Sequence, residues 1–267
     1  TSQIRLTHGP EEQGTADWSP DGTKIAYDTQ SATSVNPGTR DIYVMDANGL
    51  NKTNLTGSDT QVSWSTNPDW SPSGNKIVFE ASRDGNDGRR MIHVMNSDGS
   101  GITPLDGGYY DSNPTWSPDG SKIAVMTQRD GGHGNMEIFV MDADGSRQVK
   151  LTNLGKMSWA PFFHPSGEYL IFSTNVHGFQ NFELYLVDAK GRKEPVRVTF
   201  SNGFDGLPCF SPDGKSLAWT SNRGIAKQSQ IHLARWNHET ALRLLAEAGD
   251  VPVPKETQGT QQPSPNA

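Results

Sequence analysis

The stretch Trp18–Gly22 reads WSPDG, and the chain repeats it with small changes four more times. The later copies are WSPSG at 70–74, WSPDG at 116–120, FHPSG at 163–167 and FSPDG at 210–214. The turn prolines follow one another after 52, 46, 47 and 47 residues, a period typical of propellers and other repeat arrays. Because proline presets φ for a turn and glycine accepts the left-handed conformation, each copy predicts a tight reversal between two strands.

Four strand-like segments accompany each copy of the turn. A short strand ends in the aromatic residue, two alternating strands follow, and a turn such as DADG leads into a fourth strand. The second strands read KIAYDT, KIVFEA, KIAVMT, YLIFST and SLAWTS. A four-stranded sheet cannot bury both faces alone, but sheets stacked radially bury them against their neighbours. The sequence therefore predicts an all-β, five-bladed β-propeller with four-stranded antiparallel blades. His93 and His232 occupy third-strand positions held elsewhere by Tyr or Phe, so we expect both to be packing residues.

The two ends of the repeat region complement each other. The last repeat has no fourth strand; its third strand runs into NHETALRLLAEAG, where Asn237 as N-cap and Gly249 as terminator predict a short C-terminal helix. The segment QIRLT at Gln3–Thr7 reads as a fourth strand with no repeat before it. We therefore expect this N-terminal strand to close the last blade. The expected blades are about 16–56, 68–105, 114–152, 160–199, and 207–234 plus 3–7.

Residues 1–249 are thus interpreted as one domain, and residues 250–267 as a disordered Pro/Gln-rich tail or linker. The chain of 267 residues has a formal net charge of −7. This acidity argues against nucleic acid as a partner, because phosphate binding needs clustered Lys and Arg. No apolar run is long enough to predict membrane insertion. The single cysteine, Cys209, lies between Pro208 and Phe210 and is expected to be a small buried hydrophobe.

The repeated pattern WSPDGxxIaF, followed by IyvMdaDG and LT, resembles the WD40-like Pro-Asp repeat of TolB-type β-propellers. The match covers nearly all of residues 1–249. The later segments, among them FHPSGEYLIFSTNVHGFQNFELYLVD, look like the closing blades of bacterial exported TolB-like proteins. The resemblance implies a periplasmic or secreted location. TolB itself has six blades and an N-terminal domain, whereas this chain shows five blades. In some relatives such a propeller precedes a zinc aminopeptidase domain, and no HExxH motif occurs here.

The loops between second and third strands, and those between blades, share one face of the expected propeller and vary in length and composition. Function concentrates in such loops on a rigid scaffold. Asp111 and Asp205 hold equivalent positions there, so they are candidate ligands for Ca²⁺ at the channel mouth; the alternative is loop capping. Arg83, Arg129 and Arg223 share the position after the second strand, where the family pattern makes them blade-to-blade hydrogen-bonding partners.

Aromatic residues on the same face are candidates for binding a peptide or a sugar, since amphipathic rings dominate binding hot spots. They are Trp64, Tyr109, Tyr110, Trp159 and Phe179. The alternative for them is packing between blades. His133 and His177 lie in equivalent loops, and His177 joins the candidate binding residues. Two histidines with an aspartate are a weaker candidate for a metal site, because a whole blade separates them.

No GxSxG elbow and no Ser–His–Asp grouping at a shared loop position is visible. We therefore expect a non-catalytic binding propeller, a monomer that recognises a protein or peptide, or alternatively a carbohydrate, through its loop-rich face. No cofactor is required, and Ca²⁺ is the one candidate ion. Two alternatives stay open. One is a hydrolase or lyase with its site at the channel mouth, and the other is the accessory propeller of a larger exported peptidase.

Overall fold

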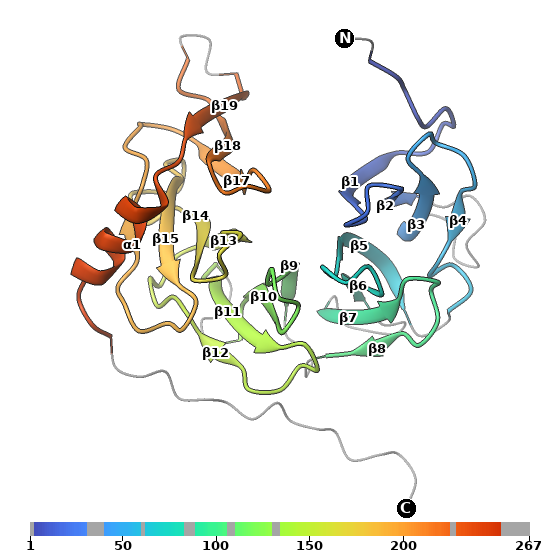
Figure 1. The fold of residues 1–267 in the computed structure, drawn as a ribbon, viewed down its shortest axis with the longest axis horizontal. Coiled ribbons are helices and arrows are strands. Elements are labelled where there is room, and N and C mark those ends of the chain that lie inside the picture. The colour runs from blue at the N-terminus through green and yellow to red at the C-terminus, as the bar shows by residue number, and fades with distance from the viewer. Residues whose placement is uncertain are drawn as a thin grey trace, which may run out of the picture. The chain divides into compact units, whose positions relative to one another are not determined.

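The computed structural model describes residues 3–30, 40–59, 62–82, 89–105, 110–129, 134–224 and 228–251. Antiparallel sheets make up most of it, and five of them follow one another along the chain (Figure 1). They are the five blades of a β-propeller, as the repeat predicts. The chain divides into two compact units, Thr1–Pro114 and Thr115–Ala267, with the boundary inside the first strand of the third sheet.

The first two sheets belong to the N-terminal unit and have the orders β1-β2-β3-β4 and β5-β6-β7-β8. In each of them consecutive strands pair with their chain neighbours, so every connection is a hairpin. Their strands are β1 (Gln13–Trp18), β2 (Lys24–Gln30), β3 (Arg40–Asp46), β4 (Thr53–Asn54), β5 (Ser63–Trp70), β6 (Lys76–Ser82), β7 (Arg90–Asn96) and β8 (Thr103–Pro104).

The third and fourth sheets have the orders β12-β11-β10-β9 and β13-β14-β15-β16, and the fifth is β17-β18-β19. Each fourth strand is only two residues long. The strands are β9 (Asp111–Trp116), β10 (Lys122–Thr127), β11 (Glu137–Asp142), β12 (Val149–Lys150), β13 (Ser158–Phe163), β14 (Tyr169–Thr174), β15 (Glu183–Asp188), β16 (Val196–Arg197), β17 (Asp205–Phe210), β18 (Ser216–Ser221) and β19 (Gln230–Arg235).

The WSPDG stretches form the turns that the sequence predicts. In the first copy, the Gly22 backbone N–H donates to the Ser19 carbonyl at 2.8 Å, and Gly22 has φ of +68°. The Ser19 hydroxyl donates to Asp21 at 2.6 Å and accepts from the Lys24 backbone N–H at 2.9 Å. These bonds satisfy the polar groups of a tight turn locally. The turn is thus held by hydrogen bonds among its own neighbouring residues.

The second and third strands of the blades supply the core. In the second blade, Ile77, Phe79 and Met95 are fully buried and pack with residues of the first blade in one hydrophobic cluster. His93 is 1% exposed and stacks on Phe79 with the ring centroids 5.6 Å apart. His232 holds the same position in β19 and faces Trp219 at 5.5 Å. Both histidines are therefore packing residues, as expected from the repeat.

The fifth sheet has three strands, so the expected closure by the N-terminal segment does not appear in it. Gln3–Thr7 is not a strand in this structure. Leu6 packs instead beside Ile25, Tyr27 and Met45 of the first blade, and its carbonyl accepts a hydrogen bond from Lys52 Nζ at 3.1 Å. The structure differs from the prediction because this segment is held by side-chain packing on the first blade. To be a strand, it would need backbone hydrogen bonds to the edge of a sheet.

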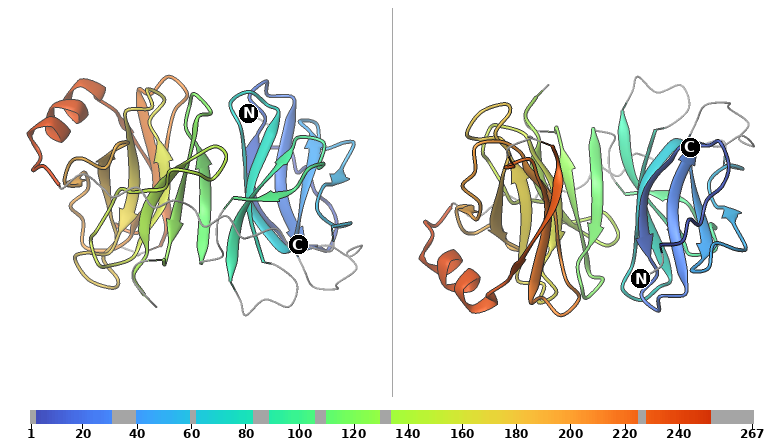
Figure 2. Two further views of the ribbon diagram at one scale, coloured as in Figure 1. Left: turned by 90° about the horizontal axis from the view of Figure 1, so that it is seen from below. Right: turned by 90° about the horizontal axis from the view of Figure 1, so that it is seen from above.

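The C-terminal helix forms where the sequence predicts it. Helix α1 (His238–Glu247) begins after the N-cap Asn237, whose side chain accepts from the Thr240 backbone N–H at 2.9 Å. Its buried residues Ala241 and Leu245 pack in the cluster that joins the fourth and fifth blades, and the helix lies beside β15 (Figure 2). No described helix is long and apolar enough to span a membrane. The expected tail lies, from residue 252 onward, outside the described residues.

Candidate functional site

Asp205 is the centre of a polar cluster at the start of the fifth blade. Its side chain is fully buried, and both carboxylate oxygens accept hydrogen bonds. Oδ1 accepts from the indole N–H of Trp219 at 3.3 Å, and Oδ2 accepts from the Ser201 hydroxyl at 2.9 Å and Arg223 Nη2 at 2.5 Å. Burial by itself raises the pKa of Asp205, but hydrogen bonds from Ser221 and Ser201 and the Arg223 charge outweigh it and lower this pKa. Asp205 is therefore a buried anion held by the protein.

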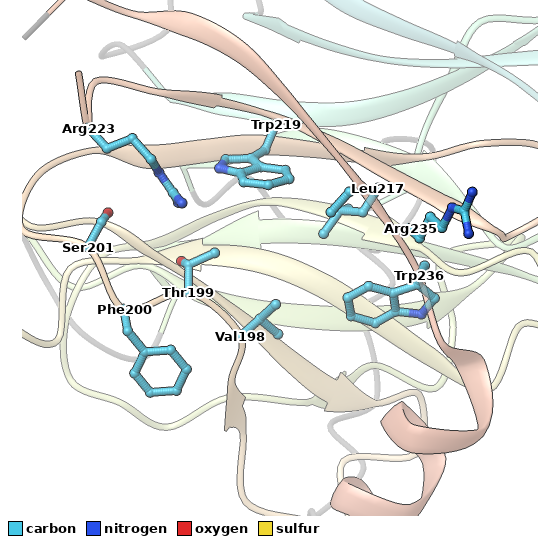
Figure 3. A pocket seen from close by; sticks show the side chains of 10 residues that line it. Val198, Thr199, Phe200, Ser201, Leu217, Trp219, Arg223, Arg235 and Trp236 are labelled. Carbon is cyan, nitrogen blue, oxygen red and sulfur yellow. The ribbon is translucent and has the colours of Figure 1, made fainter.

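Arg223 connects this cluster to a cavity. Its Nε donates to the Ser221 hydroxyl at 2.9 Å, and its guanidinium lies 5.3 Å from the centroid of the Trp219 ring. Figure 3 shows the guanidinium pointing into the space between Trp219 and Ser201. The sequence suggested a blade-to-blade hydrogen bond for Arg223, but its ion pair with Asp205 joins residues of the same fifth blade. The position of its guanidinium beside a cavity was not foreseeable from the repeat.

The cavity has a volume of about 410 Å³ and lies between the segment after β16 and the β18–β19 pair. Leu217 and Trp219 contribute apolar surface from β18, and Ala234 contributes from β19. Val198 and Thr199 line it from the fourth blade, and Trp236 stands at the end that leads to α1 (Figure 3). Its volume lies within the range of small-molecule sites, roughly 300–1,000 Å³.

Buried carboxylates in the other blades have structural partners. Glu183 accepts hydrogen bonds from the Thr199 hydroxyl and from Arg197 Nη2, the latter at 2.9 Å. Glu137 accepts from the Thr152 hydroxyl at 2.6 Å and from the Gly155 backbone N–H at 2.8 Å. The threonines and acids recur at matching positions, so these bonds hold the start of the third strand to the segment after the fourth.

A similar network of hydrogen bonds to a buried carboxylate occurs in the N-terminal unit. Glu80 in β6 is fully buried and accepts from the Thr66 hydroxyl at 2.7 Å, from Arg90 Nη1 at 2.5 Å and from the Ser112 hydroxyl. Arg90 in turn lies 5.5 Å from the ring centroid of Tyr110. Tyr110, one of the predicted binding residues, is thus a partly buried cation–π partner in this network.

The remaining predicted residues of the N-terminal unit show two kinds of environment. Asp111 is fully buried at the start of β9. Trp64 is 41% exposed and has φ of +50°. Among the residues that the structure describes, no group of three or more His, Cys, Asp or Glu side chains could hold a metal ion. The candidates Arg83, Tyr109 and His133 lie outside the described residues.

Three aromatic rings gather on the loop-rich side of the fourth and fifth blades. Trp159, Phe182 and Phe204 have ring centroids 5.7–6.1 Å apart in every pairing. The residues just before β15 and β17 pair as a parallel bridge between Phe182 and Phe204, which brings the rings together. Gly206 makes room for them, since a Cβ there would lie 2.5 Å from Phe204 Cζ. The sequence pointed to Trp159 but not to the two phenylalanines. Their only signal in the sequence is that each directly precedes an acidic residue that begins a strand.

Two exposed apolar residues lie three positions away in the sequence from the phenylalanines of this aromatic trio. The Trp159 indole N–H is buried and has no hydrogen-bond partner among the described residues. Phe179 is 82% exposed, and Leu207 is 51% exposed with φ of +54°. His177, also exposed, forms a hydrogen bond of 2.6 Å between Nε2 and the Tyr185 hydroxyl. We call Trp159, Phe179, Phe182, Phe204 and Leu207 the aromatic surface.

Cys209 is exposed, so the expectation of a buried hydrophobe is wrong. The strand β17 alternates after a register shift between Gly206 and Cys209. This alternation places Cys209 on the exposed side of the strand with Leu207, while Pro208 and Phe210 face the protein. Burial of part of the side chain nevertheless raises the pKa of the thiol, which keeps it protonated at neutral pH.

Sheets of four short strands, repeated with the WSPDG turn, define a β-propeller of the Pro-Asp repeat class. The family model described as the TolB beta propeller domain matches residues 1–155 and 132–255. The chain belongs to this family. No curated protein sequence matches the chain.

Several solved structures share the fold. TolB from Acinetobacter baumannii has a TM-score of 0.68 at 19% identity; the alignment covers 86% of this chain and 53% of that one. An oligogalacturonate lyase from Vibrio parahaemolyticus has a TM-score of 0.61 at 13% identity, with 89% and 66% covered. The propeller domain of the Trilobed protease from Pyrococcus furiosus, described as having an open velcro topology, has a TM-score of 0.57 at 13% identity, with 86% and 70% covered. The chain thus spans about half the length of Acinetobacter TolB.

Proposed function

We propose that this chain is a non-catalytic recognition propeller that binds a protein or peptide partner through the aromatic surface of its loop-rich face. The observation that carries the proposal is the packed group of Trp159, Phe182 and Phe204, with the exposed residues Phe179 and Leu207 each three positions away in the sequence from one of its phenylalanines. Large apolar side chains on a rigid support favour association, because their burial needs little ordering of the binding site.

Two features of the surface support this function. The Trp159 indole N–H lacks a partner among the described residues, so a carbonyl from a bound chain would satisfy a buried donor. Leu207 adopts a left-handed backbone conformation that costs a non-glycine residue about 1–2 kcal/mol. The same left-handed position recurs at Ala160 in β13, so this conformation belongs to the repeated strand and holds Leu207 on a rigid part of the blade.

The buried carboxylates favour binding over catalysis. Asp205 and Glu183 each accept hydrogen bonds from an arginine and a hydroxyl, which satisfies their oxygens within the protein. A general acid or base must reach a substrate proton. Because fold neighbours include an oligogalacturonate lyase and a protease propeller, the enzymatic alternative is tested by incubating the purified chain with acidic oligosaccharides and with peptides. Turnover that survives repurification would support that alternative.

The recognition function is tested by comparing which partners bind to the immobilised wild-type chain and to matched variants of it. Immobilised wild-type chain is compared with the double variant Phe179→Ser and Leu207→Ser, and with Leu50→Ser as the control. Leu50 is 63% exposed and lies in the turn between β3 and β4 of the N-terminal unit, whereas all residues of the aromatic surface belong to the C-terminal unit. We expect partners captured by the wild type and by the Leu50 variant to be lost from the double variant. Equal capture by all three would contradict the proposed surface.

A further inference from the structure

The cavity between β16 and the β18–β19 pair exists because one repeated position is small. On the third strand, the cross-strand partner of Leu217 is Ala234. The matching pairs in the other blades join a buried second-strand residue to Met45, Met95, Met141 or Val187. All four of these larger side chains are buried. The fifth blade thus lacks the atoms that fill this place in its neighbours.

A second departure from the repeat forms the end wall. Where the other blades turn into a fourth strand, the fifth continues into Trp236 and α1. The Trp236 backbone N–H donates to the Lys215 carbonyl at 2.8 Å, and its indole N–H donates to the Tyr169 hydroxyl at 2.8 Å. Burial raises the pKa of Tyr169 to about 12, so this hydroxyl stays protonated. The wall is fixed by hydrogen bonds, so the cavity is formed before any ligand arrives.

The cavity combines an apolar floor with positive charge. Leu217 and Trp219 are 2% and 8% exposed and present apolar surface. At one end, Arg223 uses Nε and Nη2 for Ser221 and Asp205, and its Nη1 donates to no atom of the described residues. Arg235 also lines the cavity and has no ion-pair partner in the described part of the chain. A guanidinium presents several donors that match a carboxylate.

We propose that this cavity binds a small apolar carboxylate, with the carboxylate at Arg223 and the apolar body along Leu217 and Trp219. The inference goes beyond the proposed function, since it concerns a small ligand rather than a protein partner. Asp205 positions Arg223. The buried Asp205 carboxylate holds Nη2 of Arg223, and the other edge of the guanidinium is left facing the cavity. Two features select the ligand class: the apolar surface disfavours small hydrophilic anions, and the guanidinium donors of Arg223 offer a cation no acceptor.

The probe is decanoate, a straight-chain carboxylate, measured by isothermal titration calorimetry against the purified chain. Decanol and decylamine have the same chain without the negative charge. We expect decanoate to bind and decylamine not to bind, with decanol weaker than decanoate by about ten-fold or more, as for loss of a charged hydrogen bond. Absence of decanoate binding to the wild type, or equal binding of decylamine, would overturn the proposal.

Ala234→Met fills the cavity with the side chain that three other blades use at this position. The control is Ala218→Met, because Ala218 pairs with Leu233 and faces the other side of the same sheet. We expect decanoate affinity to fall at least ten-fold in the Ala234 variant and to stay within two-fold of wild type in the control. Retained affinity in a folded Ala234 variant, judged by circular dichroism, would sink the proposal.

A further variant covers the case in which Ala234→Met fails to fold. Arg235 forms no ion pair in the described part of the chain and is exposed, so Arg235→Gln removes charge at the cavity without breaking a structural contact. We expect weaker decanoate binding, by about three-fold or more, and a smaller loss of affinity on raising the salt concentration, because one screened charge is gone. Affinity and salt dependence equal to wild type in this variant would count against the charged half of the proposal.

Discussion

The fourth and fifth blades carry the same repeat, yet the same positions have opposite environments in them. Leu184 and Leu186 on β15 are 0% and 1% exposed, whereas Ile231 and Leu233 on β19 are 75% and 73% exposed. The residue types are equivalent, so the strand's own sequence does not decide its burial. Burial depends on what covers the face: in the fourth blade it is the fifth blade, whereas the fifth blade is the last sheet of its own unit.

The backbone shows the same contrast. In the fourth blade the Leu184 carbonyl accepts from the Val198 backbone N–H at 2.8 Å, and the Leu184 N–H donates to the Thr199 hydroxyl at 2.9 Å. Leu55, Leu105 and Leu151 make the equivalent backbone bond in the three other four-stranded blades. No described residue occupies that place beside Ile231. The comparison teaches that turns and hairpins are local properties of this repeat, whereas the outer edge of a blade depends on a further segment.

The largest expected effect comes from shortening the matched leucines. Leu186→Ala should lower the free energy of unfolding by about 3 kcal/mol, because it opens a cavity in a closed core. Leu233→Ala should change it by less than about 0.5 kcal/mol, as is usual for an exposed position. Urea unfolding of the two variants beside wild type measures both effects. A loss at Leu233 as large as that at Leu186 would mean that the outer face of β19 is covered in solution.

A smaller effect should appear in the pH dependence, where the two blades differ at one turn residue. The fourth blade has His164 where the fifth has Ser211. His164 is 4% exposed and stacks on His238 of α1 with the ring centroids 4.6 Å apart. Burial lowers the pKa of His164 below its usual 6.5; a hydrogen bond to the Gly214 carbonyl opposes this, and the neighbouring His238 adds a smaller lowering effect.

Because the folded state binds this proton less readily than the unfolded state, stability conferred by neutral His164 is present above about pH 6.5 and decreases as the pH falls below it. The midpoint of thermal unfolding should therefore drop between pH 7 and pH 5. His164→Ser restores the residue found in the other turns and should give a flatter profile, with a lower midpoint at pH 7 through loss of the stack. Parallel profiles for the variant and wild type would exclude His164 as the titrating group.

The local parts of the fold could be predicted from the sequence. The WSPDG turns close with their own side chains, as at Ser19 and Asp21, so their outcome depends on five adjacent residues. Helix α1 follows from the Asn237 cap and an apolar face for the same reason. The position of Gln3–Thr7 was predicted wrongly, since a strand at a sheet edge depends on a partner far away in the chain.

The candidate site was predictable only in part. Asp205, Arg223 and Trp159 stood out because they interrupt or mark the repeat. Their partners could not be found by spacing, since Ser201 and Trp219 reach Asp205 from segments without a shared motif. The cavity depends on the small side chain of Ala234, and this becomes visible only when the registers of all five blades are compared.

The smallest expected effect tests the strained bulge that both blades share. Leu207 and Ala160 hold the same position in β17 and β13 with φ of +54° and +51°. In the N-terminal unit the position is taken by Asn67 and Asn113, which tolerate this conformation better than other non-glycine residues. Glycine would relieve strain of about 1–2 kcal/mol and lose about 0.5–1 kcal/mol through added freedom of the unfolded chain.

Leu207→Gly should therefore raise the free energy of unfolding by about 0.5 kcal/mol, since the leucine side chain is half exposed and loses little packing. Ala160→Gly is the matched control in the complete blade and should give a similar gain. Urea unfolding of both variants measures the two values. If Leu207→Gly instead destabilises the chain while Ala160→Gly does not, the leucine side chain is buried in solution, and the aromatic surface is then already occupied by another part of the same chain or by a second copy.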